Sequence, residues 1–118
     1  MKENIKKISY VIPVYNEQKR LKILLKKILF FKKKYKKIDS DFIVVNDGSN
    51  DKSCQILKKA TEHFKFIKLI NLQKNYGKGY ALKKGVLSAK KDYIVTLDAD
   101  LSVKFEQIFI WFNNYKIN

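Results

Sequence analysis

The chain has 118 residues, of which 46% are hydrophobic, and it contains only four Gly and one Pro, a composition that excludes an intrinsically disordered protein. This length suits a single domain over residues 1–118, and the one Cys excludes both a disulfide framework and a multi-cysteine zinc site. With 26 basic and 11 acidic residues the net charge is +15, as in proteins that bind nucleic acid or anionic membranes. However, Arg20 is the only arginine. A lysine-biased composition therefore explains most of the charge, and specific nucleic-acid readout is not expected.

No stretch of the sequence has the roughly 18 uncharged residues of a membrane-spanning helix. The first apolar run, residues 8–14, contains Pro13 and continues directly into polar residues, unlike a signal peptide. The sequence therefore predicts a cytoplasmic protein. Attraction to the cytoplasmic face of a membrane is a further hypothesis that the charge leaves open.

Short β-prone runs alternate with segments of helical periodicity along the whole chain. The first helix, for example, has Leu21, Leu24 and Ile28 at helical spacing. Strands are predicted at 8–14, 41–47, 64–72 and 93–97, and helices at about 17–35, 51–63, 80–90 and 103–115. This order predicts an α/β fold, with a mainly parallel sheet flanked by helices and right-handed crossovers.

Polar residues before the predicted helices are candidate caps. Asn16 is expected to cap the first helix, Asn50 or Asp51 the second, and Ser102 the last. Pro13 lies near the end of the first strand, so its position there is expected to be unpaired.

The segment 92–100 reads as a buried strand that ends in two carboxylates. On an extended segment the side chains of Asp98 and Asp100 would point to the same side and could face one divalent cation. Mg²⁺ and Mn²⁺ prefer such oxygen ligands. An Asp-x-Asp alone, however, is more typical of a surface turn, and only the rest of the chain favours the metal site.

Two other predicted strands also end in polar residues. The first strand ends in the segment 13–17 and the second in 46–49. Because the carboxyl ends of parallel strands share one edge of the sheet, these groups and the two aspartates are expected to meet in one crevice. Each group also has a local explanation, such as a turn at Asp47 or a backbone conformation that favours glycine at Gly77 and Gly79. Together they favour a binding site.

Four segments resemble, in order and spacing, the nucleotide-sugar-binding part of family 2 glycosyltransferases, which have the Rossmann-like GT-A fold. They are VIPVYNE (11–17), VVNDGSND (44–51), NYGKGYALKKG (75–85) and DYIVTLDADLS (92–102). The last two are most similar to the polyprenyl- (dolichyl-) phosphate sugar transferase branch. The resemblance implies transfer of a sugar from a UDP- or GDP-linked donor to an acceptor, such as a polyprenyl phosphate or a cell-surface glycan, with inversion.

The resemblance also implies roles for individual residues. Pro13, Tyr15 and Glu17 would line the nucleoside pocket, and Asp47 would accept a hydrogen bond from the base. Lys78, near the start of the third helix, would add a positive charge beside the phosphates.

The Asp-x-Asp motif would hold the metal. Asp98 would contact the ribose or the water shell of the metal, and Asp100 would bind a Mn²⁺ or Mg²⁺ ion that bridges the two phosphates of the donor. Asn46 departs from the family, since many relatives carry a second acid there.

The family fold continues past the Asp-x-Asp motif, so the chain resembles a GT-A domain truncated after that motif. The catalytic residues are therefore unknown, and the general base is expected downstream; Glu106 is not expected to serve. His63 and Cys54 are expected to be structural, and Trp111 with Phe105, Phe109 and Phe112 to form a helix face. The last strand would be an exposed sheet edge, which predicts self-association.

Three alternatives stay open. The first is a nucleotide-sugar-binding module without turnover of its own. The second is a basic protein that binds nucleic acid or a membrane surface, with its acidic motifs incidental. The third, a dinucleotide-binding Rossmann domain, is weaker because no G-x-G-x-x-G follows the first strand.

Overall fold

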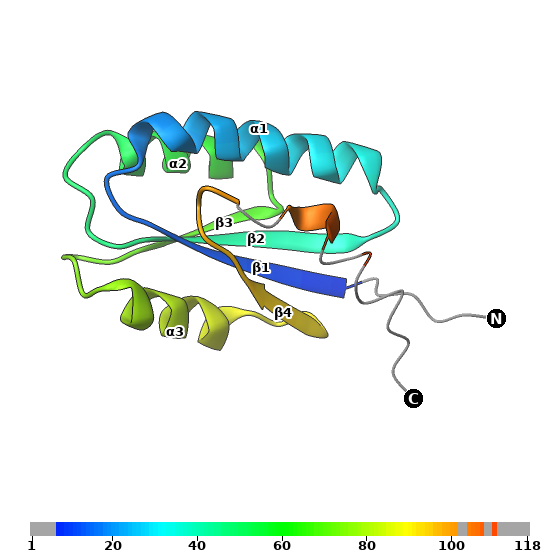
Figure 1. The fold of residues 1–118 in the computed structure, drawn as a ribbon. Helices are drawn as coiled ribbons and strands as arrows, with labels where there is room; N and C mark the ends of the chain where they lie inside the picture. The colour runs from blue at the N-terminus through cyan, green and yellow to red at the C-terminus, as the bar shows by residue number, and fades with distance from the viewer. Residues whose placement is uncertain (1–6, 102–103, 108–109, 111–118) are drawn as a thin grey trace.

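Four parallel strands form the central sheet, in the spatial order β3-β2-β1-β4 (Figure 1). The structure is a computed structural model, and it describes residues 7–101, 104–107 and 110. The strands span Lys7–Val14 (β1), Asp39–Asn46 (β2), Ile67–Asn71 (β3) and Tyr93–Thr96 (β4). The parallel sheet predicted from the alternation of strands and helices is confirmed.

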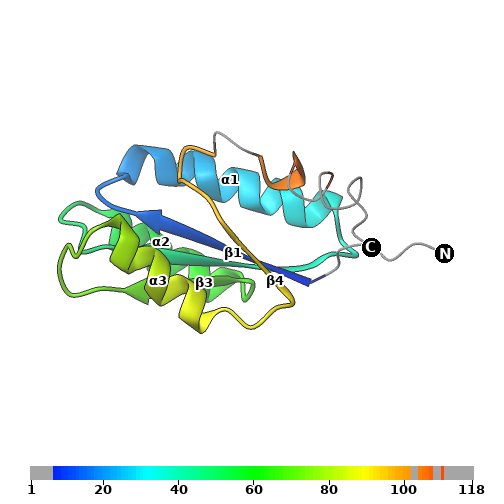
Figure 2. The same ribbon diagram turned by 60° about the horizontal axis from the view of Figure 1, so that its bottom comes forward.

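Helices cover both faces of the sheet. They span Gln18–Lys34 (α1), Ser53–His63 (α2) and Lys78–Ser88 (α3). Helices α1 and α2 lie on one face and α3 lies on the other, as Figures 1 and 2 show from two directions. Each helix follows one strand and precedes the next, which is the connection that parallel neighbours require.

The larger core lies between the sheet and the α1–α2 layer. Side chains alternate along a strand, so Ile8, Tyr10 and Ile12 of β1 share this side. The ring of Tyr10 stacks on Phe42 of β2 at 5.1 Å between centroids, and Phe105 packs edge-on against Tyr10 at 4.9 Å. The Tyr10 hydroxyl donates to the carbonyl oxygen of Phe105 at 3.2 Å. These contacts hold the segment after β4 against the sheet.

A smaller core lies under α3. It contains Val11, Val45 and Ala81. Gly85 of α3 faces the same strands, and a Cβ atom at this position would lie 2.3 Å from a methyl carbon of Val11. Glycine therefore lets α3 approach the sheet closely, and this position fixes how α3 sits above β1.

Strand β4 is less buried than predicted. In the part of the chain that the structure describes, it pairs with β1 and forms one edge of the sheet. Tyr93 is 41% exposed and Ile94 is 42% exposed. The prediction of a strand buried on both faces is wrong, because an apolar run by itself does not show how many neighbours a strand has.

The boundaries of several elements also differ from the predictions. Strand β3 begins only at Ile67, whose N–H donates to the carbonyl oxygen of Phe64 at 3.1 Å in a turn. Helix α3 begins two residues before the predicted Tyr80. Residues 105–107 are helical, and most of the predicted last helix, with Ser102 and Trp111, lies outside the described residues. Within the described residues, none of the helices is long and apolar enough to span a bilayer.

Candidate functional site

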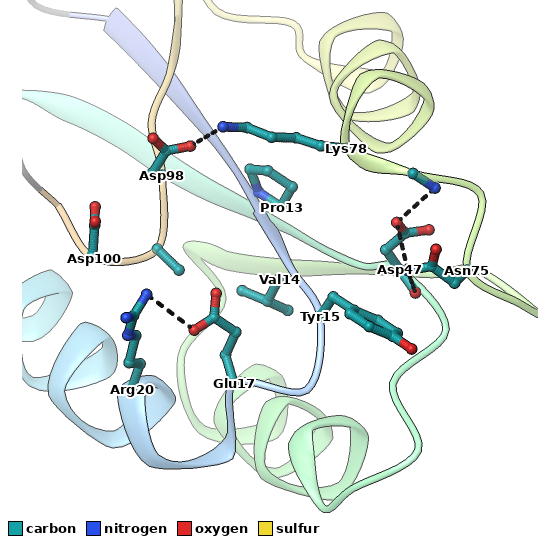
Figure 3. Close-up of a pocket in the computed structure, with 12 residues that line it drawn as sticks. Pro13, Val14, Tyr15, Glu17, Arg20, Asp47, Asn75, Lys78, Asp98 and Asp100 are labelled. Carbon is teal, nitrogen blue, oxygen red and sulfur yellow. Dashed lines mark hydrogen bonds and ion pairs between the residues drawn. The ribbon is translucent and has the colours of Figure 1, made fainter.

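The strand ends with polar residues do meet in one crevice of about 420 Å³ (Figure 3). Its walls come from the carboxyl ends of β1, β2 and β4, the first turn of α1 and the loop before α3. The lining residues are Pro13, Val14, Tyr15, Glu17, Arg20, Asp47, Asn75, Gly77, Lys78, Asp98, Ala99 and Asp100. Every residue predicted for the site is among them.

Strand β1 supplies the floor of the crevice. Pro13 and Val14 lie between the acidic groups of the two walls (Figure 3). The carbonyl oxygen of Val11 accepts from the N–H of Leu97 at 2.9 Å, so this side of β1 faces β4. Pro13 faces the same way, two residues further on and beyond the end of the β1–β4 ladder, which extends only to Thr96. Pro13 stays opposite Val45 in the β1–β2 ladder, but its nitrogen lies on the β4 side, where the ladder has ended, so its missing N–H leaves no ladder bond unmade.

The loops after β1 and β2 are bonded to each other. Asn16 has a φ angle of 48°, and its side-chain oxygen accepts from the N–H of Asn50 at 2.7 Å. Its own N–H donates to the hydroxyl of Ser49 at 2.9 Å. The prediction that Asn16 caps α1 is therefore wrong, because its side chain joins the two loops and the first residue before the helix is Glu17.

Asp51 reinforces this connection by accepting from both helices. One carboxylate oxygen accepts from the N–H of Ser53 at 2.9 Å and the other from the N–H of Gln18 at 3.2 Å. Burial acts to raise the pKa of Asp51, but the hydrogen bonds from Ser53 and Gln18 outweigh it and the pKa is lowered. The starts of α1 and α2, and with them one wall of the crevice, are thus held together by a carboxylate.

Asp47 organises the opposite wall. It is only 3% exposed, and each of its carboxylate oxygens accepts a backbone N–H, from Tyr76 at 2.8 Å and from Gly77 at 2.9 Å. The side-chain amide of Asn75 donates to the same carboxylate at 3.2 Å. Gly48 fits beneath this loop, since a Cβ atom there would lie 2.2 Å from the backbone of Lys74. Asp47 therefore fixes the loop that leads into α3.

The hydrogen bonds of Asn46 explain why an amide suits this position. Its NH₂ group donates to the side-chain oxygen of Asn71 at 2.9 Å. Its oxygen accepts from the hydroxyl of Ser49. A carboxylate would accept but could not donate, so this part-buried bond to β3 would be lost.

Asp98 and Asp100 lie in a turn rather than on an extended segment. The N–H of Leu101 donates to the carbonyl oxygen of Asp98 at 2.9 Å, and Leu101 has a φ angle of 50°. The extended geometry predicted for the pair is wrong, because β4 ends at Thr96. Both carboxylates nevertheless face the crevice, and Asp98 forms an ion pair with Lys78 across it (Figure 3).

Arg20 is a lining residue that the sequence motifs did not place in the site. Arg20 lies in the first turn of α1, three residues after Glu17, and the charged groups of the two side chains are 3.4 Å apart. Both lie on the same side of the crevice as Asp100 (Figure 3). Its being the only arginine and its spacing from Glu17 were signals that could have found it. Asn75 was also not predicted for the site, although it opens the NYGKGYALKKG motif.

The acidic turn suits a divalent cation that is held partly by a phosphate. Among the described residues no group of three His, Cys, Asp or Glu side chains could hold a metal ion by itself. Asp98 and Asp100 offer hard oxygen ligands on an open crevice. One or two carboxylates combined with phosphate oxygens and water are the usual environment of Mg²⁺. The residues present therefore fit a metal–diphosphate rather than a closed metal site.

Residues that were expected to be structural lie away from the crevice. The sulfur of Cys54 accepts a hydrogen bond from the side-chain amide of Asn71 at 3.0 Å. His63 packs beside the ring of Phe64. Glu106 forms an ion pair with Lys34 at 3.6 Å.

The sequence is similar to those of known sugar transferases. The undecaprenyl-phosphate 4-deoxy-4-formamido-L-arabinose transferase of Photorhabdus laumondii is 43% identical over 107 residues, which cover 90% of this chain and 33% of the relative. The human dolichyl-phosphate beta-glucosyltransferase is 36% identical over 109 residues, which cover 87% of the chain and 34% of the relative. The chain thus spans about a third of the length of these relatives.

Solved structures show the same fold. The mannosyltransferase PcManGT from Pyrobaculum calidifontis, in complex with GDP-Man and Mn²⁺, matches with a TM-score of 0.70 at 22% identity over 80% of this chain and 28% of that one. TarS 1–349 from S. aureus in complex with UDP matches with a TM-score of 0.69 at 26% identity, over 80% and 27%. The sheet and its helices are those of a GT-A glycosyltransferase. A family model described as "Glycosyl transferase family 2" matches residues 9–110, and the chain belongs to this family.

Proposed function

We propose that residues 1–118 form the donor-binding unit of a metal-dependent glycosyltransferase that uses a nucleotide-diphosphate sugar. The observation that carries the proposal is the convergence of Asp47, Lys78, Asp98 and Asp100 on one crevice in a family 2 chain. Solved structures of similar fold were determined with GDP-Man, UDP and UDP-GlcNAc, which supports a UDP- or GDP-linked donor.

The two sides of the crevice suit the two ends of such a donor. Tyr15 and Asp47 lie on the side proposed for the nucleoside, with Pro13 in the floor beside them, and Tyr15 is exposed and offers a ring. Both oxygens of Asp47 accept hydrogen bonds from the loop before α3, so contact with the base would share those oxygens. A carboxylate has about four lone-pair directions, which is enough for one further donor.

The diphosphate end is assigned to the acidic turn and its basic neighbours. Asp98 and Asp100 would hold Mn²⁺ or Mg²⁺, which when bound neutralises the diphosphate and makes it a better leaving group. The ion pair between Lys78 and Asp98 would open so that the ammonium group contacts a phosphate and the carboxylate contacts the cation or the ribose. Glu17 holds Arg20 at the edge of the crevice, where the guanidinium of Arg20 would face the negative charge of the diphosphate.

The acceptor is proposed from the names of the relatives. Two of them are named for undecaprenyl phosphate and dolichyl phosphate, so a polyprenyl phosphate at the cytoplasmic face of a membrane is the first candidate and a cell-surface glycan the second. The general base is not assigned to any residue of this chain. Inversion at the sugar would require one from elsewhere in the enzyme.

Calorimetric titration tests the donor site directly. UDP and GDP are titrated with and without Mn²⁺ into the wild type, Asp100→Asn and the control Asp92→Asn, which removes an exposed carboxylate at the opposite end of β4. We expect Mn²⁺-dependent binding of one nucleotide, retained in the control and abolished by Asp100→Asn. Failure of both nucleotides to bind to the folded protein would contradict the proposal.

A second assay separates an enzyme from a binding module without turnover. The matching nucleotide-sugar is incubated with the chain and a polyprenyl phosphate, and release of nucleoside diphosphate is measured. Release that requires the acceptor and Asp100 would show transfer by this unit. Donor binding without release would favour the binding module.

A further inference from the structure

A second groove, of about 470 Å³, runs between α1 and the segment that follows β4. Figures 1 and 2 both show this segment, drawn in orange, beside α1 and on the face opposite α3. Ile23 and Phe30 line the groove from α1, and Leu101 and Phe105 line it from the other side. The lining is thus largely apolar, unlike that of the first crevice.

The α1 side of this groove exposes large apolar side chains. Ile23 is 57% exposed and Phe30 is 62% exposed, whereas Leu24 and Ile28 of the same helix are buried in the core. Residues 20, 23, 27 and 30 recur at spacings of three and four, so Arg20 in the first crevice and the groove residues share one face of α1. The helix therefore has, besides its buried apolar face, a second face that mixes exposed apolar and basic side chains, and this face lies open beside the donor crevice.

The groove is also strongly basic. Lys26, Lys27 and Lys104 line it, and the one acid among its described lining residues, Glu106, is paired with Lys34. Helix α1, with the sequence QKRLKILLKKILFFKKK, has no acidic side chain. A surface that combines exposed Ile and Phe with closely spaced lysines has the composition of segments that bind anionic bilayers.

We propose that this face of α1, with the groove beside it, docks on an anionic phospholipid bilayer. Ile23 and Phe30 would enter the boundary between headgroups and acyl chains, while Lys26, Lys27 and Lys104 contact lipid phosphates. A second copy of the chain is a poorer occupant, because two such faces would bring lysine against lysine. The inference does not depend on the donor site, although docking in this orientation would place the Arg20 end of the crevice close to the bilayer.

Vesicle sedimentation tests the proposal with variants that keep the buried face of α1 intact. The vesicles contain phosphatidylcholine with either 25% phosphatidylglycerol or none. The test variants are Lys26→Glu/Lys27→Glu and Ile23→Ser/Phe30→Ser. The matched controls lie on α3, on the opposite face of the sheet: Lys83→Glu/Lys84→Glu for charge and Leu87→Ser for an apolar side chain that is 72% exposed. Circular dichroism confirms that each variant is folded.

The expected result is partition onto the anionic vesicles only. Because each lysine near such a surface is worth about fivefold in partition, removing Lys26 and Lys27 should weaken it by roughly 30-fold, and the two glutamates of the variant should weaken it further. The Ile23 and Phe30 variant should weaken it by at least about tenfold, and both α3 controls should bind within about threefold of the wild type.

Three results would overturn the proposal. The first is a lack of binding to anionic vesicles, and the second is an equal loss in the α3 charge control, which would mean that overall charge attracts the chain. The third is a dimer in solution that Ile23→Ser/Phe30→Ser dissociates while vesicle binding is unchanged. That result would assign the groove to a second copy.

Discussion

Replacing Asp47 by asparagine should loosen the loop before α3 and destabilise the protein. Each Asp47 oxygen accepts one backbone N–H, from Tyr76 or from Gly77, and the carboxylate is buried. Asparagine keeps one acceptor and turns an NH₂ group toward the other N–H. One part-buried N–H donor is left unsatisfied and the remaining bond loses its charge, which together cost about 2–3 kcal/mol in the free energy of unfolding.

Thermal and urea denaturation measure this cost. For a chain of this size we expect the Tm of Asp47→Asn to fall by roughly 10 °C or more, and that of the exposed control Asp92→Asn to stay within about 2 °C. Amide hydrogen exchange gives a local reading, since the N–H groups of Tyr76 and Gly77 should exchange faster in the variant.

The opposite outcome would refute this reasoning. If Asp47→Asn unfolds within about 0.5 kcal/mol of the wild type, the carboxylate does not hold the loop. A loss of nucleotide affinity with unchanged stability and unchanged exchange at Tyr76 and Gly77 would instead support direct contact between Asp47 and the base.

Two further predictions concern α3 and the sheet edge. Gly85→Ala should destabilise the protein by about 1–3 kcal/mol in urea denaturation, because the Cβ of the alanine would collide with Val11. The control Gly79→Ala, whose Cβ would meet no atom within 4 Å, should be neutral or slightly stabilising. Equal losses of stability in the two variants would contradict the packing argument. Self-association through the edge of β4, where Ile94 is exposed, should produce dimers at high concentration in analytical ultracentrifugation, and Ile94→Lys should remove them. A wild-type protein that stays monomeric at every concentration would contradict the prediction of self-association.

Local patterns in the sequence determined the order of elements and the edge of the sheet that carries the site. The helical spacing of Leu21, Leu24 and Ile28 marked the buried face of α1, and all three are in the core. Polar residues at three strand ends had to meet once the strands were parallel. These inferences needed only the spacing of residues close together in the sequence and the rule that parallel strands end at the same edge of a sheet.

The tertiary structure decided how each group in the crevice is held. The partners of Asp47 lie 29 and 30 residues further along the chain, and Asn16 is bonded to Asn50, 34 residues away. No local pattern encodes such bonds, because they depend on how the crossovers bring two loops together. The same holds for Arg20, which enters the site through the angle at which α1 leaves β1.

The exposure of individual apolar residues also could not be predicted from the sequence alone. Ile94 lies in a segment that reads as a buried strand and Phe30 within the first predicted helix, yet both side chains are exposed. Burial depends on which neighbours the sheet order and helix packing supply, and periodicity reports only which residues share a face. The sequence by itself determined a family 2 α/β unit with an acidic turn at its site, whereas the packing of α1 and β4 decided which apolar faces remain open.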